Sequence, residues 1–194
     1  SAEQCSQVCA FFDCFYDGNN LILVDPAMAD NGSLYPAFDE SFPAEMAKVC
    51  AKADLILPNI TEACLLTGTP YKTSYDESYI HELLKKLLAL GCHTAALTGV
   101  SYEKGRLGVV SLDRNGDTFS YFTRHCPQSY HGTGDLYSST VLGGLMRGLS
   151  LGNALSLAAD FVVACIEATA SAENARWYAV EFESQIPLLC EMLD

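Results

Sequence analysis

The apolar positions of the 194-residue chain follow two different spacings. Long segments repeat apolar side chains every three to four residues, which predicts amphipathic helices. Short continuous apolar runs lie between them and are typical of strands buried in a parallel sheet. The predicted helices span residues 3–16, 43–52, 61–67, 76–90, 134–148, 152–170 and 173–193. The predicted strands span residues 21–24, 54–58, 94–97, 106–112 and 117–123, the last two forming a hairpin.

Strands that alternate with helices indicate an α/β fold built on a mostly parallel sheet, here with an antiparallel hairpin near one edge. We expect residues 1–194 to form a single domain. In open sheets of this kind, ligands bind at the carboxyl ends of the strands. Asp25, Asn59 and Thr98 each fall at or just after such an end. The sequence therefore predicts that these three polar side chains converge on one rim.

The charge balance restricts the partners. The formal net charge is −13, with 24 acidic and 11 basic side chains. Such a surface repels nucleic-acid backbones and anionic membranes. A site for an anionic substrate such as ATP must therefore be built locally, from backbone N–H groups, a helix N-terminus and a metal ion. The apolar run at 154–170 is interrupted by Asp160 and Glu167, so we expect no membrane-spanning segment.

The nine cysteines form no CxxC motif, and their number is odd. Their spacing fits neither a zinc site nor a small disulfide framework. Most lie in apolar helix or strand patterns, where cysteine packs as a small apolar side chain. The first residues contain neither a basic region nor an apolar core, so we expect no secretory signal. Free core thiols and no signal together predict a cytoplasmic protein.

One glycine-containing motif precedes an apolar helix: Gly132-Thr133-Gly134-Asp135. Glycines let the backbone approach a ligand closely, and the first N–H groups of a helix can bind an anion. A carboxylate in that first turn could accept a proton from an attacking hydroxyl group. Asp135 could equally complement the helix dipole, with the glycines serving only a turn. The motif by itself leaves both interpretations open.

Two further strand ends carry candidate chemistry. Asn59, followed three residues later by Glu62, has the pattern of a helix capping box. Glu62 could also lie near a magnesium shell, because Mg²⁺ prefers hard oxygen ligands. Asp25 could complete a carboxylate cluster around a cation, or it could serve a turn. The chain contains no GxxxxGK[ST] motif, which excludes a P-loop enzyme.

The order of these motifs is more specific than any one of them. DPAMADNG, Tyr35, LPNITEACLLTG, LTG and HGTGD follow one another and precede Ala-rich helices. This arrangement resembles the ribokinase superfamily and, within it, the pyridoxal kinase family. Hydroxymethylpyrimidine kinases are also similar, but their glycine motif resembles GTGC, with Cys at the position of Asp135. The resemblance implies a three-layer αβα fold, incomplete here at its N-terminus.

The resemblance also implies roles for individual residues. Asp135 would be the catalytic base acting on the 5′-hydroxymethyl group of pyridoxal, and Gly132, Thr133 and Gly134 would form the anion hole. The remaining implied roles concern ATP, with Asn59, Glu62, Thr98 and Tyr35 at its phosphates, and Mg²⁺, with Asp25 and Glu62 near the ion. A monovalent cation and a homodimer of the full-length protein are further implications.

Two departures from the family pattern qualify the resemblance. Ala29 stands where the family usually has Gly. The family's N-terminal stretch, which carries core strands and the main pyridoxal contacts, has no counterpart in this chain. Two alternatives therefore stay open beside pyridoxal kinase: a hydroxymethylpyrimidine kinase, and a non-catalytic fragment that binds nucleotide or associates with another chain.

Overall fold

The computed structural model describes residues 1–128, 130–172 and 178–193. By its internal packing the chain divides into two compact units. The first unit comprises Ser1–Tyr102 with Val109–Phe119, and the second comprises Glu103–Gly108 with the segment from Ser120 to the C-terminus. The predicted single domain stays a prediction.

The first unit contains helices α1 to α4 and most of the strands. Its helices are α1 (Ala2–Phe15), α2 (Phe42–Cys50), α3 (Ile60–Thr67) and α4 (Glu77–Leu90). The strands of the main sheet are β1 (Leu23–Val24), β4 (Leu55–Ile56), β5 (Thr94–Val100), β6 (Arg106–Asp113) and β7 (Thr118–Arg124), in the order β1-β4-β5-β6-β7. Residues 106–108 of β6 and residues 120–124 of β7 belong to the second unit.

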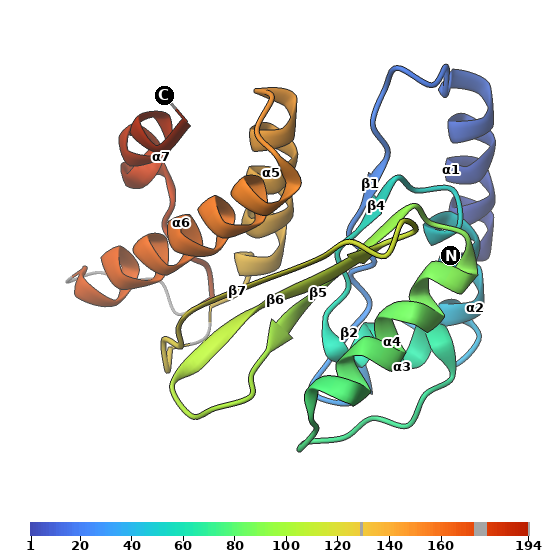
Figure 1. The fold of residues 1–194 in the computed structure, drawn as a ribbon, viewed down its shortest axis with the longest axis horizontal. Coiled ribbons are helices and arrows are strands. Elements are labelled where there is room, and N and C mark those ends of the chain that lie inside the picture. Colours follow the sequence, from blue (N-terminus) through green and yellow to red (C-terminus); the bar gives the residue numbers. More distant parts are fainter. Residues whose placement is uncertain (129, 173–177, 194) are drawn as a thin grey trace. The chain divides into compact units, whose positions relative to one another are not determined.

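Strands β1, β4 and β5 run parallel, with Leu55 opposite both Leu23 and Thr94. Figure 1 shows α1 to α4 on one side of these three strands. The continuous apolar runs are explained by burial, since Ile56, Ala95 and Leu97 have no exposed surface. These observations confirm the predicted α/β class. They also place the ends of three strands together at one rim.

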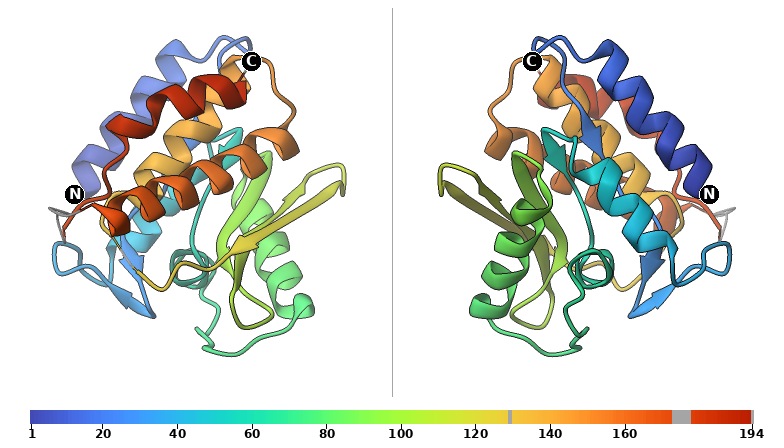
Figure 2. Two further views of the ribbon diagram at one scale, coloured as in Figure 1. Left: turned by 90° about the vertical axis from the view of Figure 1, so that its left-hand side faces the viewer. Right: turned by 90° about the vertical axis from the view of Figure 1, so that its right-hand side faces the viewer.

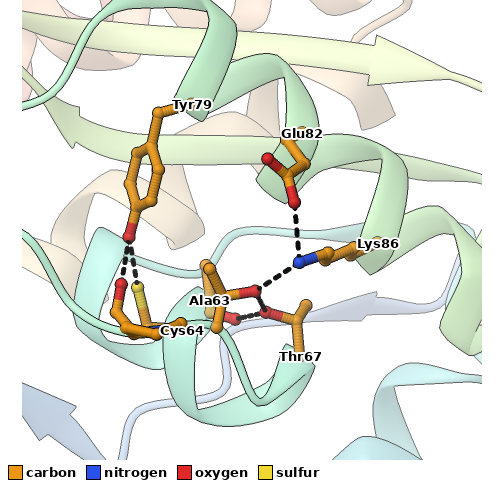
Figure 3. Close-up of polar contacts among 8 residues, drawn as sticks. Ala63, Cys64, Thr67, Tyr79, Glu82 and Lys86 are labelled. Carbon is orange, nitrogen blue, oxygen red and sulfur yellow. Dashed lines mark hydrogen bonds and ion pairs between the residues drawn. The ribbon is translucent and has the colours of Figure 1, made fainter.

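Polar contacts join helix α4 to α3 and to the loop between them, as Figure 3 shows. The Tyr79 hydroxyl donates to the Pro70 carbonyl (2.7 Å) and lies 3.1 Å from the Cys64 sulfur. Lys86 pairs with Glu82 (2.8 Å) and donates to Thr69 Oγ1 (3.1 Å). These contacts hold the loop between the two helices in place. The loop also reaches the residue that follows β5, because the Ser101 N–H donates to the Tyr75 hydroxyl (3.0 Å).

The first and last predicted helices differ in how far the structure confirms them. Helix α1 forms as predicted. Within Ala2–Phe15 only Cys5 is buried, whereas Phe11 and Phe15 are 58% and 60% exposed. The predicted helix 173–193 is wrong over residues 178–182. There the chain is not helical, and it continues into a short 3₁₀ turn and α7 (Ile186–Leu193). Residues 173–177 lie outside the described residues.

Residues 29–34 contain the turn-forming sequence Asp30-Asn31-Gly32-Ser33 and are not among the predicted strands. They form a separate two-stranded hairpin, β2 (Ala29–Asp30) with β3 (Ser33–Leu34). Asn31 and Gly32 at its tip have φ angles of 50° and 81°. Positive φ at both central residues is the geometry of a type I′ turn, for which Asn-Gly is the preferred pair. Figure 2 shows this hairpin (light blue) as a short ribbon following β1.

The second unit is mainly helical. Helix α5 (Thr133–Met146) packs along α6 (Leu151–Ser171), and α7 packs on α6 (Figure 2). The Tyr121 hydroxyl, on β7, donates to the Asp160 carboxylate at 2.8 Å. Contrary to expectation, α6 is long and apolar enough to cross a membrane by length and composition alone. Phe161 and Cys165 on this helix are fully buried, and 33% of its apolar stretch is buried within the structure.

Candidate active site

The structure brings four of the predicted residues together at the rim of the first unit. Asn59 follows β4 and forms a parallel bridge with Thr98, which lies near the end of β5. The Thr98 N–H donates to the Pro58 carbonyl (2.9 Å) and fixes the two strand ends in register. Asp25 directly follows β1 and is close enough to Glu62 for its charge to affect that carboxyl group. Three strand ends thus supply polar groups to one place.

Asn59 and Glu62 form the predicted capping box of α3. The Asn59 side chain accepts from the Glu62 N–H (2.9 Å), and Glu62 Oε2 accepts from the Asn59 N–H (2.9 Å). The other Glu62 oxygen reaches across to the segment after β1, where it accepts from Met28 N–H (3.0 Å) and lies 3.5 Å from Ala29 N. Glu62 therefore ties α3 to the hairpin as well as capping its own helix.

The Glu62 carboxyl is 3% exposed. Burial raises its pKa from the ordinary 4.5 to about 7, the Asn59 and Met28 N–H groups oppose that rise, and the nearby Asp25 charge adds to it. Burial disfavours the charged form because it removes water from the carboxylate. At neutral pH this group is poised between its two protonation states. A cation beside Asp25 and Glu62 would favour the charged form.

This raised pKa predicts how stability depends on pH. Between the unfolded and folded pKa values, the folded state binds more protons than the unfolded chain, so stability falls as pH rises. We expect the free energy of unfolding of the metal-free protein to fall by about 2 kcal/mol from about pH 5.5 to 8.5 through this group. Denaturant unfolding in the presence of a chelator measures it. Glu62→Gln removes the titrating carboxyl and should flatten this part of the profile; an unchanged slope would contradict the assignment.

The hairpin presents Tyr35 at the same part of the unit. Tyr35 directly follows β3, its side chain is 44% exposed, and its N–H donates to the Met28 carbonyl (2.9 Å) at the base of the hairpin. The Asn59 amide donates to the Ala29 carbonyl (2.8 Å). Ala29 lies buried in β2 and has no positive φ, so its methyl group fits without strain where the family usually has Gly.

The glycine motif lies in the second unit, at the start of α5. Gly132 has φ 86° and is the N-cap residue, which places Thr133, Gly134 and Asp135 in the first turn. The first backbone hydrogen bond of the helix runs from Leu136 N–H to the Gly132 carbonyl (2.9 Å), so the preceding N–H groups have no partner within the helix. Asp135 is exposed, and there is open space at Gly132 and Gly134. This geometry can accept an anion.

The donors at the rim fit a magnesium ion held partly by water. Among the described residues, no group of three or more His, Cys, Asp or Glu side chains could hold a metal. Mg²⁺ commonly takes only one or two carboxylates and keeps several waters. Asp25 and Glu62 would supply two carboxylates, and the repulsion that raises the Glu62 pKa would be relieved by a cation. The pair therefore suits a hydrated Mg²⁺ rather than a protein cage.

Comparison with known proteins places this arrangement in a family. The model of the phosphomethylpyrimidine kinase family matches residues 2–178, which is most of the chain. The chain belongs to this family. A solved pyridoxal kinase from Lactobacillus plantarum is 30% identical and superposes with a TM-score of 0.87, covering 99% of this chain and 68% of that one. This confirms the predicted ribokinase-like fold, a mostly parallel sheet flanked by helices.

Curated relatives of two substrate classes match this kinase-family chain equally. A pyridoxine kinase of Bacillus subtilis is 27% identical over 75% of this chain and 54% of its own length. A hydroxymethylpyrimidine/phosphomethylpyrimidine kinase of Aquifex aeolicus is also 27% identical, over 76% of this chain and 57% of its own. The chain therefore spans about half the length of the curated relatives it matches. Identity alone does not separate the two substrates.

Sequence reasoning missed the partners of Glu62 and of the hairpin tip. The Gly32 N–H donates to Thr61 Oγ1 (3.0 Å), although Thr61 carried no predicted role. The Asn31-Gly32 pair was a usable signal for the hairpin, because it favours a type I′ turn. Nothing in the sequence indicates that the Met28 N–H, on a segment 34 residues away, reaches the Glu62 carboxylate.

Proposed function

We propose that the protein phosphorylates the 5′-hydroxymethyl group of pyridoxal, with ATP as the phosphoryl donor. The observation that carries this proposal is the rim formed by Asp25, Asn59, Glu62 and Thr98 in a chain of this kinase family. Phosphoryl transfer is catalysed mainly by positioning and charge stabilisation. The rim offers both. Its side-chain oxygens come from three strand ends, and backbone hydrogen bonds fix those strand ends relative to one another.

The residues of the two units have different roles in this proposal. In the first unit, Asn59, Thr98 and Tyr35 bind the ATP phosphates, and Asp25 and Glu62 hold Mg²⁺ through its waters. That ion would neutralise phosphate charge. In the second unit, the first N–H groups of α5 at Gly132, Thr133 and Gly134 stabilise the transferring phosphoryl group. Asp135 accepts the proton of the substrate hydroxyl.

Pyridoxal is favoured over a pyrimidine by the residue at the start of α5. An exposed carboxylate stands at position 135, where hydroxymethylpyrimidine kinases resemble GTGC. We further propose a cytoplasmic location, supported by nine free thiols. A homodimer and a monovalent cation requirement follow from the resemblance alone.

A substrate panel tests the proposed function. The protein is assayed with Mg²⁺ and ATP against pyridoxal, pyridoxine, pyridoxamine and 4-amino-5-hydroxymethyl-2-methylpyrimidine under the same conditions. We expect kcat/KM for at least one of the three B6 vitamers to exceed that for the pyrimidine by tenfold or more, which is about 1.4 kcal/mol of discrimination. A preference for the pyrimidine would support the second candidate, which the Aquifex aeolicus relative favours.

A third candidate, a non-catalytic fragment, is favoured by two observations. The chain spans about half the length of its curated relatives, and α1 exposes Val8, Phe11 and Phe15. Exposed apolar surface of this kind marks association sites. Turnover on any of the four substrates would exclude this candidate. Absence of turnover combined with retained ATP binding would support it.

A further inference from the structure

The tip of the β2–β3 hairpin is held from the side of α3. Gly32 N–H at the tip donates to Thr61 Oγ1 at 3.0 Å. Thr61 is 3% exposed and lies between Asn59 and Glu62, whose side chains tie the base of the hairpin through Ala29 and Met28. The Thr61 hydroxyl group thus adds a third contact to those of Asn59 and Glu62. Of these three contacts, it alone is made at the turn of the hairpin.

The same tip is held from the loop that precedes α4. A Cβ atom built on Gly32 would lie 3.0 and 3.1 Å from two ring carbons of Tyr71, so this ring packs directly against the glycine. Tyr71 is 40% exposed, so its other side remains accessible to water. Gly32 suits this position for two reasons: its φ of 81° favours glycine, and a Cβ atom would press tightly against the ring.

These contacts matter because the hairpin is short. Each of its strands has two residues, and an isolated two-stranded hairpin is marginally stable in water. Its position therefore depends on what it packs against. Tyr35 follows β3 directly, so any displacement of the hairpin moves the residue assigned to the ATP phosphates.

We propose that Thr61 and Tyr71 are positioning residues that set the affinity for ATP by pinning the tip of the β2–β3 hairpin. This inference rests on the proposed function, in which Tyr35 binds the ATP phosphates. Neither residue touches the nucleotide in this proposal.

The expected loss of ATP affinity follows from the fraction of molecules in which the hairpin occupies its pinned position. Apparent affinity falls in proportion to the population that is competent to bind. Loss of the part-buried hydrogen bond from the Gly32 N–H lowers the equilibrium constant for the pinned position roughly threefold to tenfold, and a marginally stable hairpin loses population by about that factor. ATP affinity should fall by the same factor. Affinity for the vitamin substrate should stay within about twofold, because no part of the hairpin is assigned to it.

The test compares paired variants in the full chain. Thr61→Val removes the hydroxyl group with little change of shape, and Thr61→Ser restores it. Tyr71→Ala removes the ring, and Tyr71→Phe keeps it. Thr67→Val is the matched control, because Thr67 lies on the same helix and bonds the Ala63 carbonyl (2.7 Å) rather than the hairpin (Figure 3). The readouts are hydrogen exchange of the Gly32 amide, ATP affinity by calorimetry, and KM for each substrate.

Support requires faster Gly32 exchange and a threefold to tenfold weaker ATP affinity in Thr61→Val and Tyr71→Ala, with Thr61→Ser, Tyr71→Phe and Thr67→Val close to wild type. Faster exchange without a change in ATP affinity would overturn the inference, and so would a parallel rise in both KM values. Unchanged exchange would show that the contacts do not pin the tip. Wild-type protein that binds ATP but phosphorylates nothing would refute the proposed function and leave this inference standing.

Discussion

Replacing Asp135 by Ala is expected to lower kcat for pyridoxal phosphorylation by roughly 10²–10⁴-fold. Asp135 is an exposed carboxylate in the first turn of α5, beside backbone N–H groups that have no partner within the helix. A general base contributes this factor because it removes the hydroxyl proton as the new bond forms. Steady-state kinetics with pyridoxal and ATP measure the loss.

Two further variants separate a catalytic role from a structural one. Asp135→Asn keeps the shape but cannot accept the proton, so it should lose nearly as much activity as the Ala variant. Glu191→Gln removes one negative charge from an exposed position on α7 of the same unit and should retain activity within about twofold. If Asp135→Ala kept activity within about threefold of wild type, the general-base role would be refuted.

The rim at the strand ends could be predicted because it depends on local patterns. Continuous apolar runs identify buried strands, and the carboxyl ends of parallel strands share one edge of a sheet. Asn59 and Thr98 therefore had to lie close together, and their bridge confirms it. The helix ends could also be predicted from glycine, because Gly68 and Gly91 are the C-cap residues of α3 and α4 and have positive φ.

The misread segments fail for identifiable reasons. The helix predicted at 173–193 contains Pro187, and proline in a first turn marks where a helix begins, here at Ile186. The apolar face of α1 was read correctly as apolar, but periodicity does not say what covers it, and Phe11 and Phe15 remain exposed. The hairpin was signalled by Asn31-Gly32, although its strands are too short to show alternation.

Some contacts of Glu62 are local in sequence, and others join segments that are distant in sequence. A capping box is local and could be read from Asn59 and Glu62 alone. The bond to Met28 N–H joins segments that are far apart in the chain, and the raised pKa depends on burial and on Asp25. Such features appear only once the chain has folded. They also make this one side chain unusually important for stability.

Glu62→Ala should therefore be the most destabilising single substitution at the rim. It leaves two well-bonded N–H groups, those of Met28 and Asn59, without their acceptor in a site that is almost fully buried. Each buried donor left without a partner costs about 1–3 kcal/mol, so at about pH 5.5 we expect a loss of about 2–5 kcal/mol. Denaturant unfolding of the metal-free protein measures this loss.

The loss should shrink as pH rises, which distinguishes Glu62 from an ordinary core residue. Wild type is itself weakened above its folded pKa of about 7, whereas the Ala variant has no carboxyl to titrate, so the difference should be about 2 kcal/mol smaller at about pH 8.5. Glu82→Ala removes an exposed carboxylate that pairs with Lys86 in the same unit, and it should cost less than about 1 kcal/mol at either pH. A loss at Glu62 below about 1 kcal/mol at the lower pH would contradict its role as the tie between α3 and the hairpin.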